Sequence, residues 1–167
     1  MHSFPLSRRP YKRPESVLVV VYTVVGEVLV LRRRQPPDFW QSVTGSLRWE
    51  EIDPMDAARR ELCEETGLDD AVEVIGCGTI NRFPILPPWR HRYAPDATEN
   101  VEHVFRVPLP GRPPIVLNPA EHVECEWLPR AAAALPVCRG GTQGHRCAGK
   151  GCNASCRSQS AGRRSCW

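Results

Sequence analysis

Two apolar runs near the start of the chain predict neighbouring strands. Ser16–Val25 is almost continuously β-branched, and Val28–Leu31 follows Gly26, which suits a turn. A buried hairpin is the simplest interpretation. Further apolar runs predict more strands at Val72–Cys77, Val101–Leu109, Ile115–Leu117 and His122–Leu128. A mixed sheet with helices packed on it follows from this pattern.

A helix between these strands is predicted by its start and stop signals. Asp53 suits the N-cap, Pro54 the first helical position and Gly67 the position just past the end. One stripe of this helix is apolar and should be buried: Met55, Ala58 and Leu62. By contrast, 81–95 is rich in proline, aromatic and basic residues, so we expect an irregular loop that carries specificity.

Three glutamates project from neighbouring positions of the predicted helix. Glu61 and Glu65 are four residues apart, and Glu64 lies between them. Like charges at this spacing destabilise a bare helix by roughly 0.2–0.5 kcal/mol per pair, which a bound cation would reverse. Carboxylate oxygens favour Mg²⁺, Mn²⁺ or Ca²⁺ over zinc. The alternative interpretation of the bare pattern is an acidic helix face in contact with solvent.

Residues 45–68 resemble the Nudix box, the signature of a hydrolase family. The matching positions are Gly45, Glu51, Arg60, Glu61, Leu62, Glu64, Glu65, Gly67 and Leu68. Eight residues separate Glu51 from Arg60, one more than in the family pattern. We expect the extra residue in the loop at Ile52 and Asp53, where it leaves the helix face intact but challenges the usual contact between Glu51 and Arg60.

The resemblance implies a Nudix α/β/α sandwich with a mixed sheet and a hydrolase that uses Mg²⁺, with Mn²⁺ as a substitute. Glu61 and Glu65 would bind the metal together with Glu121, which arrives from a distant loop. Glu64 would complete the cluster or orient a water molecule. Arg60 joins these three helix glutamates in the catalytic set that the resemblance implies.

Four further segments narrow the resemblance to family members that cleave dihydroneopterin triphosphate to the monophosphate and pyrophosphate, a step toward folate. These segments are 11–14, 36–45, 90–95 and 121–128. By the same resemblance, Lys12, Arg33 and Thr44 would contact the substrate, and their chemistry suits phosphate. The residues that would line the pterin pocket are Phe83, Pro84, Ile85 and Leu86.

Two alternative functions stay open. The first is a nucleotide-pool hydrolase that acts on dATP or another nucleoside triphosphate, since such substrates also present a purine-like ring and three phosphates. The second, of another class, is a ligand-binding or nucleic-acid-binding protein that keeps the fold without turnover and uses the basic tail. An intact acidic cluster argues against the second, so we expect no nucleic-acid partner. The sequence does not predict an oligomeric state.

The 167-residue chain has a net charge of +3, but charge and cysteine content differ between its two parts. Residues 138–167 hold five Arg, one Lys, no acid and five of the eight Cys, and their charge of +6 leaves −3 for residues 1–137. We expect a Nudix domain over 1–137 and a disordered tail over 138–167. Because this tail composition is what GC-rich DNA yields in a wrong reading frame, we hypothesise a frameshift near Cys138.

The rest of the composition predicts a soluble, cytoplasmic protein. Its length suits one domain with an adequate core. No apolar run is long enough to span a bilayer, so we expect no membrane partner. The basic N-terminal segment lacks the apolar stretch of a signal peptide, because Glu15 interrupts it before the first strand.

Overall fold

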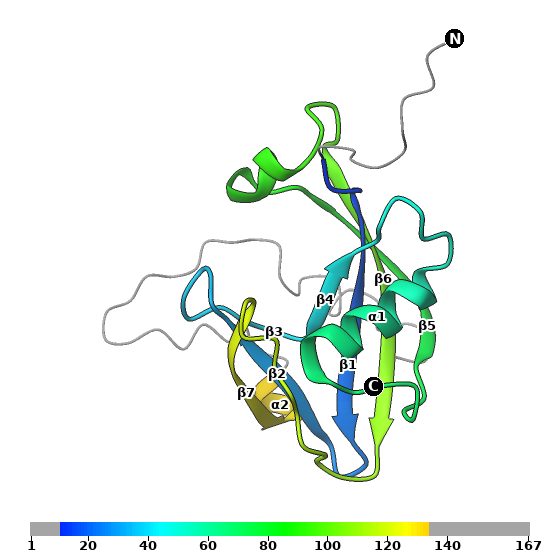
Figure 1. The fold of residues 1–167 in the computed structure, drawn as a ribbon, viewed down its shortest axis with the longest axis vertical. Coiled ribbons are helices and arrows are strands. Elements are labelled where there is room, and N and C mark those ends of the chain that lie inside the picture. Colours follow the sequence, from blue (N-terminus) through cyan, green and yellow to red (C-terminus); the bar gives the residue numbers. More distant parts are fainter. Residues whose placement is uncertain (1–10, 134–167) are drawn as a thin grey trace.

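The computed structural model describes residues 11–133 (Figure 1). The tail predicted over 138–167 lies outside these residues. The described elements, in chain order, are β1 (Glu15–Thr23), β2 (Glu27–Arg33), β3 (Trp40–Gln41), β4 (Val43–Ser46), α1 (Pro54–Thr66), β5 (Ile75–Pro84), the 3₁₀ helix η1 (Pro87–Arg92), β6 (Glu99–Leu109), β7 (His122–Pro129) and α2 (Arg130–Ala133).

All seven described strands join one mixed sheet. The order is β3-β2-β1-β6-β5, with β4 added to β1 and β7 added to β2. β1 and β6 run parallel, and the other pairs are antiparallel. The predicted α/β class with a mixed sheet is therefore confirmed.

β1 and β2 form the predicted antiparallel hairpin, but they pair only next to its turn. Gly26 turns the chain at a φ of 87°, yet Tyr22 and Val28 are the one pair recorded between the two strands. The first half of β1 pairs instead with β4, and β2 pairs with β7 along its length. The hairpin prediction is confirmed, but the pairing is short because β4 occupies the first half of that edge of β1 and β2 diverges from it.

α1 covers one face of the sheet (Figure 1). The small side chains of Ala57 and Ala58 are fully buried and let the helix approach β1 closely. Leu62 is 1% exposed, and burying a side chain of this size stabilises the fold by about 1.5–3 kcal/mol. The core against which these residues pack includes Val17, Val19, Val21, Leu29, Leu31, Phe105 and Val107.

Both predicted ends of α1 are confirmed. The Asp53 carboxylate accepts the Met55 N–H at 2.9 Å, and Pro54 is the first helical residue. Gly67 adopts a left-handed φ of 73°, and its N–H donates to the Cys63 carbonyl at 2.9 Å. Of the predicted apolar stripe, Ala58 and Leu62 are buried, and Met55 is half-buried against the core.

Two predicted segments differ from the structure. β5 starts at Ile75 rather than Val72 and continues to Pro84, so 81–95 begins as a strand and then forms η1. Pairing with β6 from Ile80 to Pro84 overrides the irregular composition. Residues 115–117 are not a strand, because the Val116 N–H donates to the Thr66 carbonyl at 2.9 Å and joins the segment to the end of α1. No helix in 11–133 is long and apolar enough to cross a membrane.

Candidate active site

Arg60 organises the carboxylates where α1 meets β4 and the loop before the helix. Its Nε and Nη2 donate to the two Glu51 carboxylate oxygens at 2.6 and 3.0 Å, a bidentate contact. Its Nη1 donates to Glu61 Oε1 at 2.6 Å, and Nη2 also reaches the Ser46 carbonyl at 3.1 Å. One guanidinium therefore fixes α1, the loop before it and the end of β4.

The contact between Glu51 and Arg60 survives the extra residue in the box. Glu51 lies in the loop before α1, and its Oε2 also accepts the Arg48 N–H at 2.6 Å. Hydrogen bonds from Arg60 lower the pKa of Glu51, although partial burial acts in the opposite direction. The expectation that the longer spacing disturbs this contact is wrong, because the loop can curve back while the helix register stays unchanged.

Glu61 packs directly against the backbone of β4. A methyl group added at Gly45 would overlap the Glu61 carboxyl group, so any larger residue there would force this carboxyl group to move. Burial raises the pKa of Glu61, hydrogen bonds from Arg60 oppose that effect, and the charges of Glu64 and Glu121 add to it. Glu61 thus combines a tight steric fit with a single strong cationic partner.

Glu65 is more deeply buried, at 1% exposure. Its Oε2 accepts the Thr44 N–H at 3.3 Å, while its Oε1 is buried and has no hydrogen-bond partner in the described part of the chain. Burial, followed by the charge of Glu61, raises the pKa of Glu65 to about 8. A bound cation or a proton would therefore stabilise this buried carboxyl group.

Glu64 and Glu121 are both exposed. Glu64 Oε1 accepts from Arg48 at 2.9 Å, and its Oε2 accepts from Arg60 at 3.3 Å. Glu121 follows a turn in which its N–H donates to the Asn118 carbonyl at 3.1 Å. The charge of Glu121 contributes to the raised pKa values of Glu61 and Glu65, so the fold brings the distant loop beside α1.

The carboxylate oxygens of these glutamates are suitable ligands for a hard divalent cation, but their present positions do not form a complete coordination site. The unpartnered Oε1 of Glu65 and the mutual repulsion of the carboxylates favour an oxygen-bound cation. Within residues 11–133, however, no three His, Cys, Asp or Glu side chains gather closely enough to hold a metal ion. Arg60 supplies the positive charge beside Glu61 and Glu64 instead.

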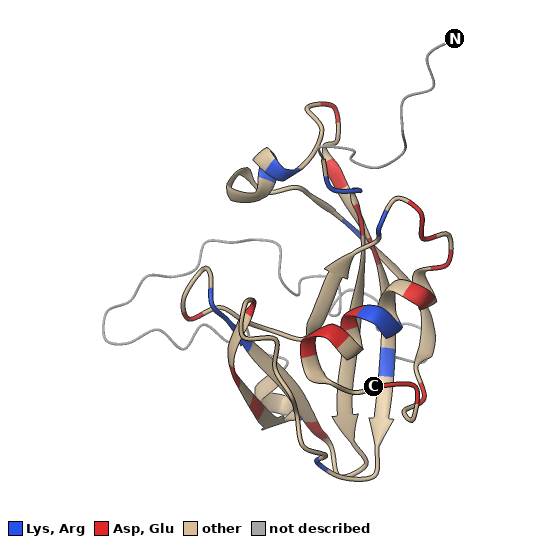
Figure 2. Ribbon diagram, in the orientation of Figure 1, with Lys and Arg blue, Asp and Glu red and all other residues tan. Residues whose placement is uncertain are grey.

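A group of cations faces this acidic cluster. Lys12, just before β1, donates its N–H to the Arg92 carbonyl at 2.8 Å, which joins the start of the domain to η1. Loss of water around the Lys12 ammonium group and the charge of Arg92 lower its pKa, whereas Glu61 and Glu121 raise it. Figure 2 shows basic residues at the end of β2 and in η1. The site thus presents cations and carboxylates side by side.

The Trp89 ring joins two of these cations. The guanidinium carbon of Arg33 lies 5.9 Å from the ring centroid, and that of Arg92 lies 5.8 Å from it. The sequence predicted Arg33 as a site residue but missed Trp89 and Arg92. The aromatic and basic composition of 81–95 was the available signal, but it does not say which side chain turns toward β2.

The other predicted substrate residues occupy varied positions. The Thr44 hydroxyl donates to the Val17 carbonyl at 2.8 Å, so its proton is engaged within the fold. Phe83 and Ile85 are half-buried, whereas Pro84 and Leu86 are exposed, as expected for alternating side chains at the end of a strand. Phe83 and Ile85 can therefore contribute to one surface, which Pro84 and Leu86 do not share.

His122 was also missed as a site residue. It is 1% exposed, and neither ring nitrogen has a hydrogen-bond partner in the described part of the chain. Burial, followed by the charge of Arg33, lowers its pKa. It lies opposite Arg33 where the pairing of β2 with β7 shifts register. A buried imidazole with a lowered pKa thus begins β7 directly after Glu121.

Comparisons with known proteins agree with this geometry. The model of the NUDIX domain family matches residues 12–146. Dihydroneopterin triphosphate diphosphatase of Escherichia coli K12 is 46% identical over 128 residues, which are 74% of this chain and 83% of the relative. The Haemophilus influenzae protein of the same name is 40% identical over 122 residues, which are 71% of this chain and 75% of the relative.

A solved structure shows the same fold. The structure of the E. coli dihydroneopterin triphosphate pyrophosphohydrolase is similar with a TM-score of 0.71 at 42% identity, covering 79% of this chain and 90% of that one. The family model spans most of the sequence, including the whole acidic helix. The chain therefore belongs to the Nudix hydrolase family.

Proposed function

We propose that this protein hydrolyses dihydroneopterin triphosphate to dihydroneopterin monophosphate and pyrophosphate. The similarity to enzymes named for this substrate, 46% identity over 83% of the relative's length, carries the proposal. The site supports the reaction class independently, since buried carboxylates lie beside Lys12 and Arg33. Such a combination suits a phosphoanhydride, whose negative charge must be neutralised before water attacks.

Members of the Nudix hydrolase family typically depend on a divalent metal ion. We assign Mg²⁺, which Mn²⁺ can replace, to Glu61, Glu65 and Glu121. When bound, the ion would neutralise phosphate charge and polarise a phosphoryl oxygen. The unpartnered Oε1 of Glu65 supports this assignment, as does the proximity of Glu121 to both helix glutamates.

The remaining charged residues have separable roles in this proposal. Lys12 and Arg33 would bind phosphate oxygens as cations. Arg60 acts as a positioning residue, because its hydrogen bond holds Glu61 in place and favours the ionised form of that carboxyl group. Glu64 is the exposed carboxylate among the three helix glutamates, so it can contact an attacking water and orient or accept its proton.

The proposal is tested by measuring pyrophosphate release from dihydroneopterin triphosphate and from dATP by the full chain. We expect release to require Mg²⁺ and to be faster with the pterin substrate. Glu65→Gln should reduce the rate at least about a hundredfold, as expected when a group that stabilises charge in the transition state is lost.

The matched control is Glu50→Gln, which removes an exposed carboxylate from the same segment and should leave the rate unchanged. Release that persists without a divalent ion, or that is unaffected by Glu65→Gln, would contradict the assignment of the site. Faster release from dATP would replace the proposed substrate with a nucleotide.

A further inference from the structure

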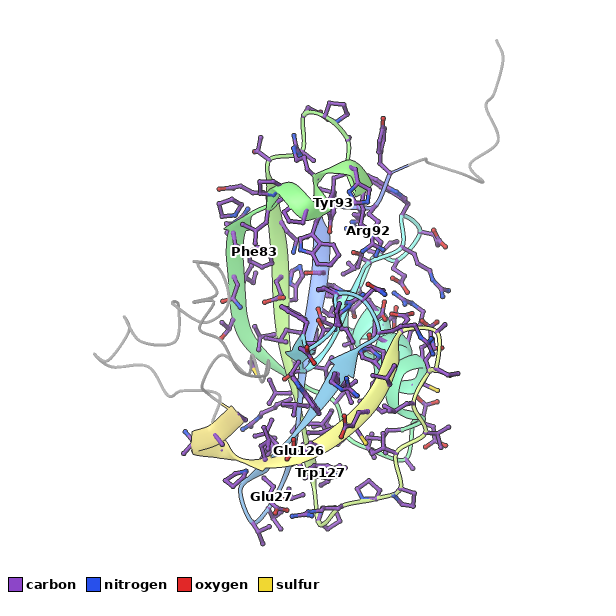
Figure 3. The ribbon with its side chains drawn as sticks, turned by 90° about the vertical axis from the view of Figure 1, so that its left-hand side faces the viewer. Glu27, Phe83, Arg92, Tyr93, Glu126 and Trp127 are labelled. Carbon is purple, nitrogen blue, oxygen red and sulfur yellow. The ribbon has the colours of Figure 1, made fainter. Side chains whose placement is uncertain are left out.

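The face of β5 and β6 turned away from α1 carries a compact group of side chains, here called the β5–β6 cluster: Asn81, Phe83, Asn100 and Glu102. Asn81 pairs directly with Glu102, and Phe83 pairs with Asn100. Side chains two residues apart share a face, so all four point to one side. Phe105 packs in the core under α1, which places the even-numbered cluster positions of β6 on the opposite side. Figure 3 shows Phe83 on β5, with Arg92 and Tyr93 on the neighbouring segment.

Glu102 is a half-buried carboxylate without a cationic partner among residues 11–133. The one hydrogen bond it makes within this part of the chain is from Asn81 Nδ2 to its Oε2, at 3.1 Å. Burial raises the pKa of Glu102, and the bond from Asn81 only partly offsets that effect. A carboxylate in this position costs stability, so its presence calls for a reason other than folding.

Asn100 provides a second, independent unsatisfied acceptor. It is 4% exposed. Its Nδ2 donates to Ser16 Oγ at 2.7 Å, but its Oδ1 is buried and has no partner within the described residues. Buried acceptors in native folds are nearly always paired. Asn100 Oδ1 thus lies buried beneath the same face of β6 on which Glu102 and the half-buried Phe83 ring are accessible.

The cluster lies within reach of the proposed phosphate site. Ser16 on β1 pairs with Glu102 of β6 on one side and with Ser46 of β4 on the other. Strands are spaced by about 4.8 Å, so β4 and β6 are roughly 10 Å apart across β1. Thr44 on β4 contacts Glu65. The cluster and α1 lie on opposite faces of the sheet, so a ligand that joins them must pass over β4, where the Thr44 N–H donates to Glu65.

We propose that Glu102, supported by Asn81 and Asn100, recognises the 2-amino-4-oxopyrimidine edge of the substrate's ring, with Phe83 against the ring. This inference rests on the proposed function and adds the residues that select the heterocycle. The edge offers two adjacent N–H donors, one on the ring and one on the exocyclic amine. An ionised carboxylate accepts both through its two oxygens, and pairing with them favours its charged form.

The same arrangement disfavours adenine. The corresponding edge of adenine has an amine donor next to a ring-nitrogen acceptor, which would face a carboxylate oxygen without an intervening proton. A site built around a hydrogen bond strongly rejects a ligand that leaves its buried polar group unpaired. Glu102 therefore distinguishes pterin and guanine rings from adenine.

The test compares wild type with Glu102→Gln using dihydroneopterin triphosphate, dGTP and dATP as substrates. The glutamine keeps the size of the side chain and can still accept from Asn81, but it places an amide donor against one N–H of the ring. We expect kcat/KM to fall about 10–100-fold for dihydroneopterin triphosphate and for dGTP, mostly through KM. For dATP it should stay unchanged or rise, because an amide complements the adenine edge.

The matched control is Glu99→Gln, an exposed carboxylate on the same strand, which should leave all three substrates unaffected. The melting temperature of Glu102→Gln should equal or exceed that of wild type, since an unpaired carboxylate is removed. An equal loss for all three substrates, or no loss, would overturn the inference.

The proposed function is judged separately, by whether the wild type prefers dihydroneopterin triphosphate to dATP. If that preference is absent, the proposed substrate is wrong. The role of Glu102 is then decided by whether Glu102→Gln lowers the ratio of dGTP to dATP hydrolysis, and an unchanged ratio would overturn it.

Discussion

The two sides of the candidate site hold their charged groups by different means. On the α1 side, Arg60 and the backbone of β4 contact the buried glutamates, and these contacts join residues within 44–65. On the opposite side, cations arrive from three distant segments and are joined by one backbone hydrogen bond and by the Trp89 ring. Changes on the first side should therefore damage turnover, and changes on the second should weaken binding.

Of the substitutions considered for the α1 side, Gly45→Ala should reduce turnover most. The added methyl group must displace the Glu61 carboxylate, which also loses its position against Arg60. A shift of about 1 Å in a catalytic group can cost about a hundredfold in rate. We expect kcat for pyrophosphate release to fall at least that much, while circular dichroism shows a folded protein.

Gly111→Ala is the matched control, because a methyl group there meets no atom within 4 Å and the residue lies outside the site. It should leave kcat unchanged. Wild-type turnover by Gly45→Ala would show that Glu61 can move without consequence, and that the close packing on the α1 side is not what positions it.

The same contrast explains what the sequence could predict. The ends of α1 depend on Asp53, Pro54 and Gly67, whose side chains or backbone freedom act on neighbouring residues, and these were predicted correctly. The burial of Glu61 and Glu65 was not foreseen, because their helical spacing alone suits a solvent-facing stripe. It depends on β4 crossing that face of the helix, which is a tertiary contact.

The opposite side depends almost wholly on tertiary contacts. Arg33 was predicted from a family resemblance, but its partner Trp89 lies in a segment expected to be irregular. Pairing with β6 extends β5 to Pro84 and so determines where η1 begins. Similarly, the short pairing of β1 with β2 follows from competition by β4 for one strand edge, and no local pattern reports such competition.

The pH dependence of metal binding tests the effect of burial on Glu65, on the α1 side of the site. Burial and neighbouring carboxylates raise its pKa from 4.5 to about 8, so in the metal-free protein it holds a proton at pH 7. A divalent ion must displace that proton. The affinity for Mn²⁺ should therefore rise roughly tenfold per pH unit up to about pH 8 and then level off.

Titration calorimetry at pH 6, 7 and 8 measures this dependence. Proton release near one per ion at pH 7 is the expected accompanying signal. Glu65→Gln should bind more weakly and lose most of the dependence. An affinity that is already constant from pH 6 would mean that Glu65 is ionised before the ion arrives, contrary to the effect of its burial.

Trp89→Leu tests the weaker side and should have the smallest effect. Contacts between a guanidinium and an aromatic face contribute about 0.5–1 kcal/mol at exposed sites, equivalent to roughly two- to fivefold in binding. Without the ring, Arg33 and Arg92 lose the aromatic surface that both guanidinium groups contact. We expect KM for dihydroneopterin triphosphate to rise by that factor with kcat unchanged, and Trp89→Phe to restore part of the loss because it keeps an aromatic face. If kcat fell instead, the cations would belong with the α1 carboxylates as part of the turnover machinery, and the division between the two sides would be wrong.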